Sequence, residues 1–336
     1  MNNVAMAQAV QDAVRPKFYG NKTLKSKVVM HFPENLAEEH ESINRQYMAL
    51  LNRTLKEHLP EIRRAIDAER AGMRMDDDFT VTRMIQQVMS RAMHVFESRA
   101  RHFGLERRIE TLASQVRRHS INEWKRVVNR TLGINILDDY YTGEFYRNMI
   151  RQWTTSNVNM IKTLPGETMT RMTNIIQNGY LSGQSNAQMA QLINEAYKGN
   201  EEKAVFWARD QTSKLNADIT EAQQRDAGVS EYVWDNSGDS RVRPCHRELN
   251  GKTIKWDDPP EMWYETKSGR VYTGRRCHPG KDYQCRCVAL PMLNLETLSL
   301  PWTGSEIGRE TGSEVDITNF GVTMTGHGLD KPVRLG

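Results

Sequence analysis

Four cysteines and two histidines near the C-terminus are the residues of this 336-residue chain best suited to chemistry. They stand in three groups along the chain: Cys245-His246, Cys277-His278 and Cys285-Arg286-Cys287. Thiolate sulfur and imidazole nitrogen are the usual ligands of structural zinc, which takes four of them in a tetrahedron. The sequence has no cysteine outside this stretch, and in a reducing compartment such a cluster indicates a metal site before it indicates disulfides.

The spacing limits which of these residues can share one ion. In a strand, residues two apart point to the same face, so Cys285 and Cys287 can converge. Adjacent side chains diverge, so the simplest tetrahedral site adds one ligand from positions 245 and 246 and one from 277 and 278. Such a closed site would supply folding energy to a small module, whereas catalysis needs an open position for water. Two alternatives stay open: free thiols without metal, and a disulfide such as Cys245–Cys277.

The segment that must position these ligands differs from the rest of the chain. Proline is absent from residues 61–164 and 166–243, and is frequent from Pro244 onward. Because proline breaks helix interiors, the first two-thirds of the chain can form long helices and the last third cannot. The sequence therefore predicts an α+β chain, in which an elongated body of several long helices precedes a small β-rich Cys/His module and an irregular C-terminal tail.

Apolar residues in the first part recur three and four apart, as on one face of a helix, and glycines follow these stretches where helices end. Ser185 and Gln188 form a capping box at the start of a further helix. The scattered histidines of this part, His40 among them, are expected on the surface or at helix ends. The expected long helices cover about 35–71, 79–103, 105–132 and 201–226.

After Gly228 the sequence is typical of short strands and turns, and Asn250-Gly251 is a strong tight-turn signal. From about residue 299 the chain has few aliphatic anchors, so we expect it to be disordered or to order on a partner, with Trp302 as a candidate anchor. The strand candidates are 232–234, 253–254, 271–272 and 286–290. The expected segments are an N-terminal arm (1–34), the helical body (35–228), the Cys/His module (229–293) and the tail (294–336).

The Cys/His module carries a family likeness. Its sequence runs VSEYVWDNSGDSRVRPCHRELNGKTIKWDDPP and, after a variable stretch, CHPGKDYQCRCVALP. This resembles the phage Mu F-like family of minor head proteins, also called head morphogenesis proteins, and the likeness covers about residues 155–292. The residues that carry it, beside the closing Cys-Arg-Cys, are Trp234, Asp239, Arg241, His246, Asn250, Gly251 and Pro259-Pro260.

The resemblance also bears on the ligands. Some members carry Cys-x-x-Cys after the Asp-x-Arg motif, where this chain has Arg243 and His246. Position therefore favours His246 over Cys245. The expected zinc ligands are His246, His278, Cys285 and Cys287, with Cys245 and Cys277 as alternates. The motif residues Trp234, Asp239, Arg241, Asn250 and Gly251 are expected to be structural.

The resemblance implies a protein present in few copies in a phage head, in its interior or at the portal vertex. Its implied partners are the portal protein and the major capsid or scaffold proteins. Its implied role is in head assembly and in DNA packaging or ejection. We expect no enzymatic activity, because only about 45 residues follow Pro291 and they are too poor in core formers for a catalytic domain. The chain has no apolar run near the roughly 18–20 residues that span a bilayer and does not start as a signal peptide. We therefore expect synthesis in the host cytoplasm and no membrane contact.

Two other functions are weighed against this one. An internal head protein that binds double-stranded DNA would need basic side chains, although a net charge of +4 is low for a dedicated nucleic-acid binder, and a solvated helix face explains the same residues. A zinc-dependent hydrolase would need a general base, yet carboxylates near turns are more often caps and ion pairs. The basic candidates are Arg117, Arg118, Lys125 and Arg126; the carboxylates are Asp239, Glu248 and Asp257.

Overall fold

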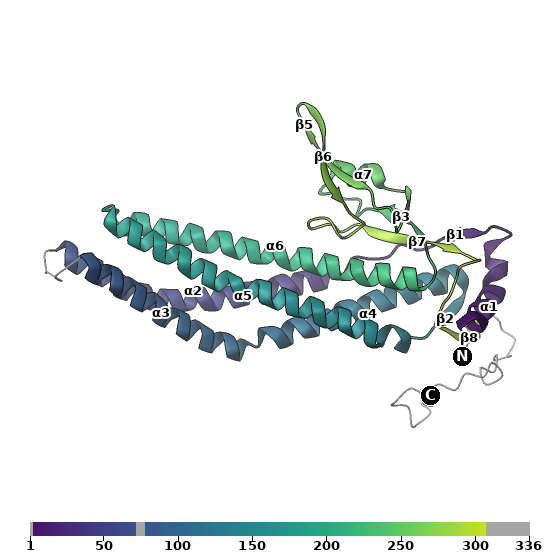
Figure 1. Ribbon diagram of the computed structural model, residues 1–336, viewed down its shortest axis with the longest axis horizontal. Coiled ribbons are helices and arrows are strands. Elements are labelled where there is room, and N and C mark those ends of the chain that lie inside the picture. The colour runs from purple at the N-terminus through teal and green to yellow at the C-terminus, as the bar shows by residue number, and fades with distance from the viewer. Residues whose placement is uncertain (1–2, 72–77, 307–336) are drawn as a thin grey trace, which may run out of the picture.

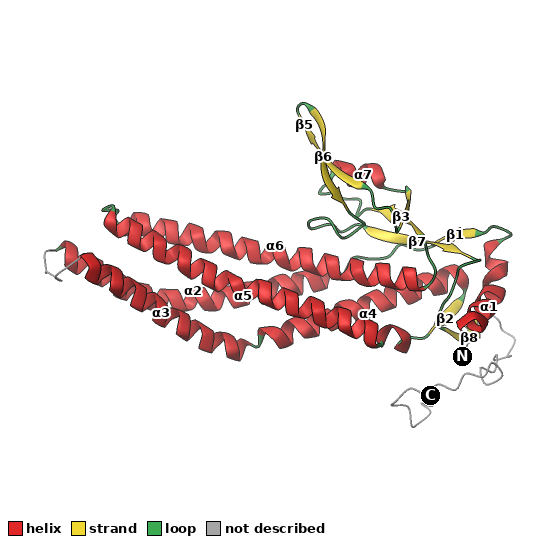
Figure 2. Cartoon of the chain, viewed as in Figure 1, coloured by secondary structure: helices red, strands yellow, loops and turns green. Residues whose placement is uncertain are grey.

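The computed structural model describes residues 3–71 and 78–306 of the chain. Five long helices run side by side and form the body, and a small β-rich module lies against one side of it (Figures 1 and 2). The α+β organisation expected from the sequence is therefore confirmed. The long helices are α2 (Glu34–Arg70), α3 (Asp78–Phe103), α4 (Leu105–Leu132), α5 (Glu144–Leu181) and α6 (Asn186–Asp226).

The helix predictions from apolar periodicity are confirmed for α2, α3 and α4, whose ends lie within a residue of the expected ones. Gly104 and Gly133 separate α4 from its neighbours with φ of 65° and 75°, in the left-handed region that glycine accepts without strain. The capping box is also present, because Ser185 Oγ accepts a hydrogen bond from Gln188 N and the Gln188 side chain accepts one from Ser185 N.

The expected break between two helices near residue 200 is wrong, since α6 is continuous from Asn186 to Asp226. Its buried positions continue through Ala196, Asn200 and Ala204, so packing against the body supports the helix across this stretch. A glycine in a helix interior costs only about 1 kcal/mol, which such burial offsets. Proline is tolerated in the same way: Pro60 lies inside α2 and Pro165 inside α5.

The Cys/His module is built on an antiparallel sheet in the order β1-β7-β3-β4, with the short helix α7 beside it. A separate β5–β6 hairpin projects away from the body (Figure 1). Three of the four strand predictions are confirmed, but the last strand begins at Val288 rather than 286. The elements are β3 (Glu231–Asp235), α7 (Pro244–Leu249), β4 (Thr253–Lys255), β5 (Glu261–Thr266), β6 (Gly269–Arg276) and β7 (Val288–Asn294).

The N-terminal segment packs onto both body and module. It forms α1 (Asn3–Val14), the 3-10 turn η1 (Arg15–Phe18) and β1 (Thr23–Lys25), which pairs with β7. Val10, Val14 and Phe18 lie in one apolar core with residues of α4, α6 and β7. This shared core fixes the module to the end of the body that carries the N-terminus.

The segment after β7 differs from the expected tail. Leu298 and Leu300 are buried in the same core, and β8 (Trp302–Glu306) pairs antiparallel with β2 (Ile134–Ile136), which is followed by the 3-10 turn η2 (Asp139–Thr142). These two leucines are the aliphatic anchors that the glycine- and threonine-rich composition obscured. Trp302 is partly buried against the core of its own chain, so it is not a free anchor for a partner. Residues 307–336 of the expected tail lie outside the described residues.

His40 is fully buried, so the expectation that the scattered histidines lie on the surface or at helix ends is wrong for this residue. Its Nδ1 lies 3.0 Å from Thr212 Oγ1 of α6, and its ring contacts Trp153 edge-on at 5.8 Å between centroids. Although His40 is polar, it lies on the face of α2 that packs against α6, and the two helices bury it between them. Within the described residues, no helix is long and apolar enough to cross a membrane.

We expect His40 to make folding stability depend on pH. Burial, offset in part by Asn157 and the carbonyl of Ala208, lowers the pKa of His40 from 6.5 to about 4. The unfolded chain binds the proton more readily, so this contribution to the free energy of unfolding is complete above pH 6.5 and is lost as the pH falls to about 4. The loss corresponds to about 3 kcal/mol. Urea unfolding across this range should show a shallower decline for His40→Gln than for the unsubstituted protein, and equal declines would contradict the assignment.

Candidate metal centre

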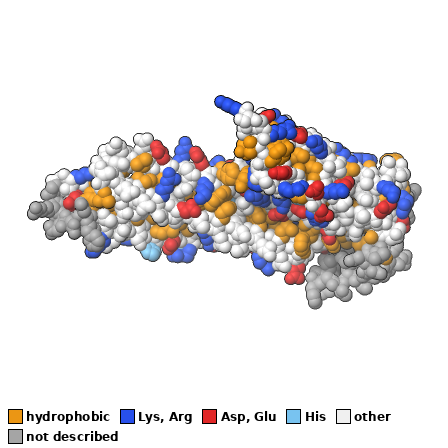
Figure 3. All heavy atoms as spheres, turned by 45° about the horizontal axis from the view of Figure 1, so that its top comes forward, with side chains coloured by type: hydrophobic (Ala, Val, Ile, Leu, Met, Phe, Trp, Pro, Cys, Tyr) orange, Lys and Arg blue, Asp and Glu red, His pale blue; other side chains and the backbone are white. Residues whose placement is uncertain are grey.

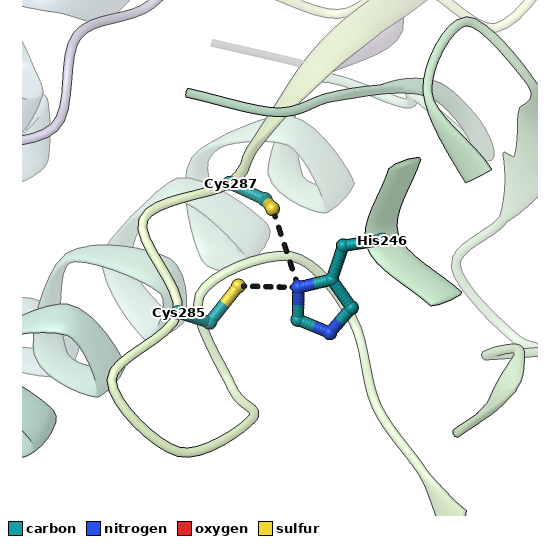
Figure 4. Close-up of side chains that lie close together, drawn as sticks. All are labelled: His246, Cys285 and Cys287. Carbon is teal, nitrogen blue, oxygen red and sulfur yellow. Dashed lines mark hydrogen bonds between the residues drawn. The ribbon is translucent and has the colours of Figure 1, made fainter. Parts of the chain in front are cut away.

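His246, Cys285 and Cys287 converge in the module (Figure 4). Their ligand atoms all lie within 4.8 Å of one another, and both sulfur atoms lie 3.6 Å from His246 Nδ1. All three side chains are buried, with at most 6% of any residue exposed. Two sulfur atoms and one imidazole nitrogen, all able to bind a metal ion, therefore surround one point in the buried interior of the module.

The spacing of these atoms fits zinc. Bonds of about 2.3 Å to sulfur and about 2.0 Å to nitrogen place the sulfur and nitrogen atoms of a tetrahedral site about 3.5 Å apart. The two N···S distances of 3.6 Å match that edge. The imidazole nitrogen thus lies at the distance from each sulfur that a shared zinc ion would require.

The convergence of the two cysteines was predicted, but the reason given for it was wrong. Both residues lie in the loop before β7 rather than in a strand, and His246 comes from α7. The loop is tightly held: Gly280 N donates a hydrogen bond to Cys285 Sγ at 3.3 Å, and Gln284 adopts a left-handed φ of 47°. Loop geometry, rather than strand alternation, turns both sulfurs inward.

The far side of the imidazole faces a carboxylate that the sequence analysis missed. Asp282 is buried, and its Oδ2 lies 3.3 Å from His246 Nε2. Arg243 and Arg275 hold Asp282 in turn, at 3.2 Å and 2.5 Å. A carboxylate on the outer nitrogen of a ligating histidine orients the ring and leaves the inner nitrogen free for the metal. The signal in the sequence was an acidic residue three positions before Cys285.

The pKa values of the three side chains in the cluster depend on one another. Burial opposes a charge on the imidazole, yet Asp282 and the neighbouring thiols outweigh it and raise the pKa of His246 to about 11. The Cys287 side chain, and then His246 against the effect of burial, hold the pKa of Cys285 well below its ordinary value. Cys285 and burial raise the pKa of Cys287. A cation among these groups would displace their protons, which is the coupling expected of metal ligands.

His278, which the sequence analysis included among the expected ligands, lies outside this cluster. Its Nδ1 is 2.8 Å from the hydroxyl of Tyr232, and its ring packs 4.8 Å from that of Trp256. The alternates Cys245 and Cys277 are free thiols, as are the other two cysteines. Cys245 is buried beside His246 and Cys277 is half-buried, so either thiol is a candidate for the fourth ligand.

The family-motif residues hold the loops around the cluster. The Trp234 ring is buried and lies 5.3 Å from the ring of His246. Asp239 accepts a hydrogen bond from Arg241 N at 2.9 Å and forms an ion pair with Arg286, the residue between the two cysteines. This pair ties the turn after β3 to the cysteine loop.

The tight turn predicted at Asn250-Gly251 is present and leads into β4, and the element before it is the helix α7. Asn250 Oδ1 accepts a hydrogen bond from Asn236 N at 2.9 Å. Gly251 has a φ of 78° and donates its N–H to the carbonyl of Trp234 at 2.8 Å. The turn therefore fixes the distance between α7, which carries His246, and β3.

Helix α6 holds the cysteine loop through a face that is buried yet polar. Ser213 Oγ donates to the carbonyls of Gly280 and Cys285, and Asp210 accepts from Gln284 N at 2.9 Å. Gly280 has a φ of +80° and packs so closely on α6 that a Cβ there would lie 2.7 Å from the Cβ of Ala217. The position of the sulfur ligands thus depends on the helical body as well as on the module.

A second set of contacts seats the sheet on the same helix. Gln224 Nε2 donates to the carbonyl of Ala289 in β7 at 2.7 Å, and Trp256 Nε1 donates to Gln224 Oε1 at 3.3 Å. Arg225 pairs with Asp257 at 2.7 Å. The apolar periodicity of this half of α6 is weak because polar side chains bond the module across it.

The basic residues considered for DNA contact divide into two kinds. Lys125 pairs with Asp138 and Arg126 with Glu123, both at 2.6 Å. Arg117 is half-buried and Arg118 is exposed on α4. On the face shown in Figure 3, positive and negative side chains are interspersed.

The carboxylates considered for a hydrolase are engaged elsewhere. Asp239 pairs with Arg286, Glu248 with Arg270, and Asp257 with Arg225. None of the three belongs to the His246 cluster found among the described residues. These three carboxylates are therefore not placed to act as a general base beside the cluster.

Comparison with known proteins agrees with the module's motifs. Residues 170–290 match the family described as phage Mu protein F like protein. An uncharacterized protein of Haemophilus influenzae is 25% identical over 248 residues, which are 74% of this chain and 53% of that protein. The chain thus spans about half the length of this relative. No solved structure is significantly similar. The resemblance to the phage Mu F-like family of phage head proteins is therefore confirmed over residues 170–290.

Proposed function

We propose that the chain is a minor structural component of a tailed-phage head that associates with the portal and acts in head assembly and in DNA packaging or ejection. The observation that carries this proposal is the extent of the family match, residues 170–290. This range contains the end of α5, all of α6 and the module as far as β7, which are the elements joined by the buried polar contacts of α6. The matched segment is thus a physical unit, and not the β-rich module alone.

Zinc is the metal proposed for the cluster, held by His246, Cys285 and Cys287 with one further ligand. The module's own apolar core is small and consists mainly of aromatic and cysteine side chains, among them Trp234 and Trp256. Small folds with little aliphatic core commonly need a metal or a disulfide for stability. A closed site would supply that folding energy and keep the loop before β7 in place.

The β5–β6 hairpin is the part of the module best placed to reach another protein. It projects from the body, and nearly all of β6 is exposed (Figure 1). Tyr264 and Tyr272 are 53% and 60% exposed, and Val271 is 39% exposed. Tyrosine is enriched at protein interfaces, where its ring supplies contact area and its hydroxyl a hydrogen bond. We propose this hairpin as the portal contact.

Co-expression with the cognate portal protein, followed by pull-down of the full chain, tests the proposed function. Tyr264→Ser with Tyr272→Ser should reduce the captured portal by roughly tenfold, as expected for the loss of two aromatic contacts. The matched control is Tyr19→Ser with Phe145→Ser, which changes two exposed aromatic residues outside the hairpin and should leave capture unchanged. Failure of the unsubstituted chain to capture the portal would contradict portal association.

A truncation after residue 228 would be a poor test of the same contact. Leu290, Leu293, Leu298 and Leu300 lie in the core shared with α4 and α6, so the truncation would expose the body core as well as remove the module. Substitutions on the hairpin avoid this, because its exposed side chains support no core.

A further inference from the structure

A groove of about 620 Å³ runs between α4 and α5 on the helical body. One end is basic, with Arg117 of α4 facing Arg147 and Arg151 of α5. The other end holds the ion pair of Lys162 with Glu106, and also Glu110. The groove therefore has one end with a net positive charge and one end where acidic side chains offset the charge of Lys162. Hydroxyl side chains also line it: Ser114, Thr142, Thr154 and Thr155.

The positive end is not neutralised by the part of the chain that the structure describes. Arg117 and Arg147 form no ion pair with any carboxylate in residues 3–71 or 78–306. Burial, and then the nearby charges of Arg147 and Arg118, lower the pKa of Arg117. Like charges held together on two rigid helices raise the free energy of the unbound groove, and an anion between them would lower it.

A buried hydroxyl at the same place lacks a partner. Thr154 Oγ1 is shielded from solvent and makes no hydrogen bond within the part of the chain that the structure describes. Because this oxygen is shielded, the exposed hydroxyl of Thr155, one helical turn from Arg151, is the one that a bound group can reach. Thr155 and the three arginines together provide donors for one anionic group.

We infer that the arginine end of this groove binds phosphate groups of a nucleic-acid backbone. Guanidinium groups bind phosphate oxygens through two parallel hydrogen bonds, and hydroxyl side chains complete such contacts. Because Glu110 and the Lys162–Glu106 pair occupy the other end, the backbone would cross the groove at its arginine end rather than follow its length. Contacts of this kind do not read base sequence.

The lining favours nucleic acid over an acidic protein. Ile150 and Val158 are the apolar side chains of the groove, and the other residues that line it are polar or charged. The core of a stable protein–protein interface is apolar and depleted of charge, whereas contacts to a phosphate backbone are mainly charged and hydroxyl-bearing. The groove thus suits a polyanion that binds by charge and hydrogen bonds.

Fluorescence anisotropy of the full-length protein with a labelled DNA duplex of arbitrary sequence tests this inference. Arg117→Gln with Arg147→Gln should weaken binding by roughly tenfold or more at low salt. The slope of log affinity against log salt should fall by about two, because each phosphate contact contributes about 0.9. Arg147→Lys, which keeps the charge without the planar fork, should lose only part of the affinity.

The matched control is Arg53→Gln with Lys56→Gln, which removes the same charge from exposed positions of α2. It should leave affinity and salt slope within about twofold of the unsubstituted values, and circular dichroism should show that all variants are folded. Equal losses in both pairs would overturn the inference, since binding would then follow total charge. Absence of DNA binding, tight binding of polyglutamate without DNA binding, or a saturable inorganic-phosphate site that DNA does not displace would overturn it too.

The inference rests on the groove alone and not on the proposed contact with the portal. Portal capture depends on the β5–β6 hairpin, which shares no residue with the groove. The two ideas therefore fail separately: an unsubstituted protein that captures the portal but does not bind DNA refutes the groove, and one that binds DNA but does not capture the portal refutes the portal contact.

Discussion

Replacing Cys285 and Cys287 together by serine is expected to remove bound zinc from the purified protein and to unfold the Cys/His module. Structural zinc sites contribute apparent folding free energies of about 10–16 kcal/mol in small zinc-binding peptides. Here α6 also supports the module through Ser213 and Asp210, so we expect a smaller loss, on the order of 3–5 kcal/mol. Metal analysis gives the stoichiometry, and the fluorescence of the buried Trp234 and Trp256 reports the packing of the module.

The matched control for this double variant is His278→Gln. His278 lies in the same module but bonds to Tyr232 rather than joining the cluster, so its replacement should leave the zinc content unchanged. Zinc lost equally from both variants would return His278 to the ligand set. An unsubstituted protein that contains no stoichiometric zinc, or a double variant that retains it, would contradict the metal centre itself.

Replacing Gly228 by alanine is expected to destabilise the chain by about 3–5 kcal/mol, through a clash at the joint between α6 and β3. Gly228 has a φ of +76°, and a Cβ there would lie 1.9 Å from the carbonyl oxygen of Thr297. The same joint is closed by a hydrogen bond from Thr297 Oγ1 to the carbonyl of Gly228 at 2.7 Å. The added methyl group must therefore separate the segment after β7 from the end of α6.

Gly238→Ala is the control for this second prediction. Gly238 has a similar φ of +69°, but a Cβ there meets nothing within 4 Å. Only the left-handed backbone strain remains, which costs about 1–2 kcal/mol. Urea or thermal unfolding of both variants separates the two effects. Equal destabilisation would mean that the contact with Thr297 does not constrain the fold.

Periodicity predicted α2, α3 and α4 closely because their buried positions are apolar and recur every three to four residues. The second half of α6 follows another rule. Its buried side chains include Thr212, Ser213, Gln223 and Gln224, which bond the body on one side and the module on the other. A rule that assigns polar residues to the surface cannot detect a helix that is buried between the body and the module by polar contacts.

The cluster of His246, Cys285 and Cys287 was predictable in part. The types and spacing of Cys285 and Cys287 indicated two ligands that converge. The position of His246 within the family motif indicated this histidine as a further ligand. The position of His278 outside the cluster and that of Asp282 beside it have one cause, since both depend on how the loop between β6 and β7 folds back onto α6. That path is set by tertiary contacts and by left-handed residues such as Gln284, which one sequence does not reveal.

The long helices of the body set the distance between its two ends. Helix α1 and strand β8 lie at one end of the body, while the turn between α5 and α6 lies at the other (Figure 1). Helix α6 alone has 41 residues. At 1.5 Å per residue it spans about 60 Å. Anything held beside α1 and β8 is thus kept a set distance from whatever contacts the turn between α5 and α6, and shortening α5 and α6 by matching turns would bring the two closer by a calculable amount.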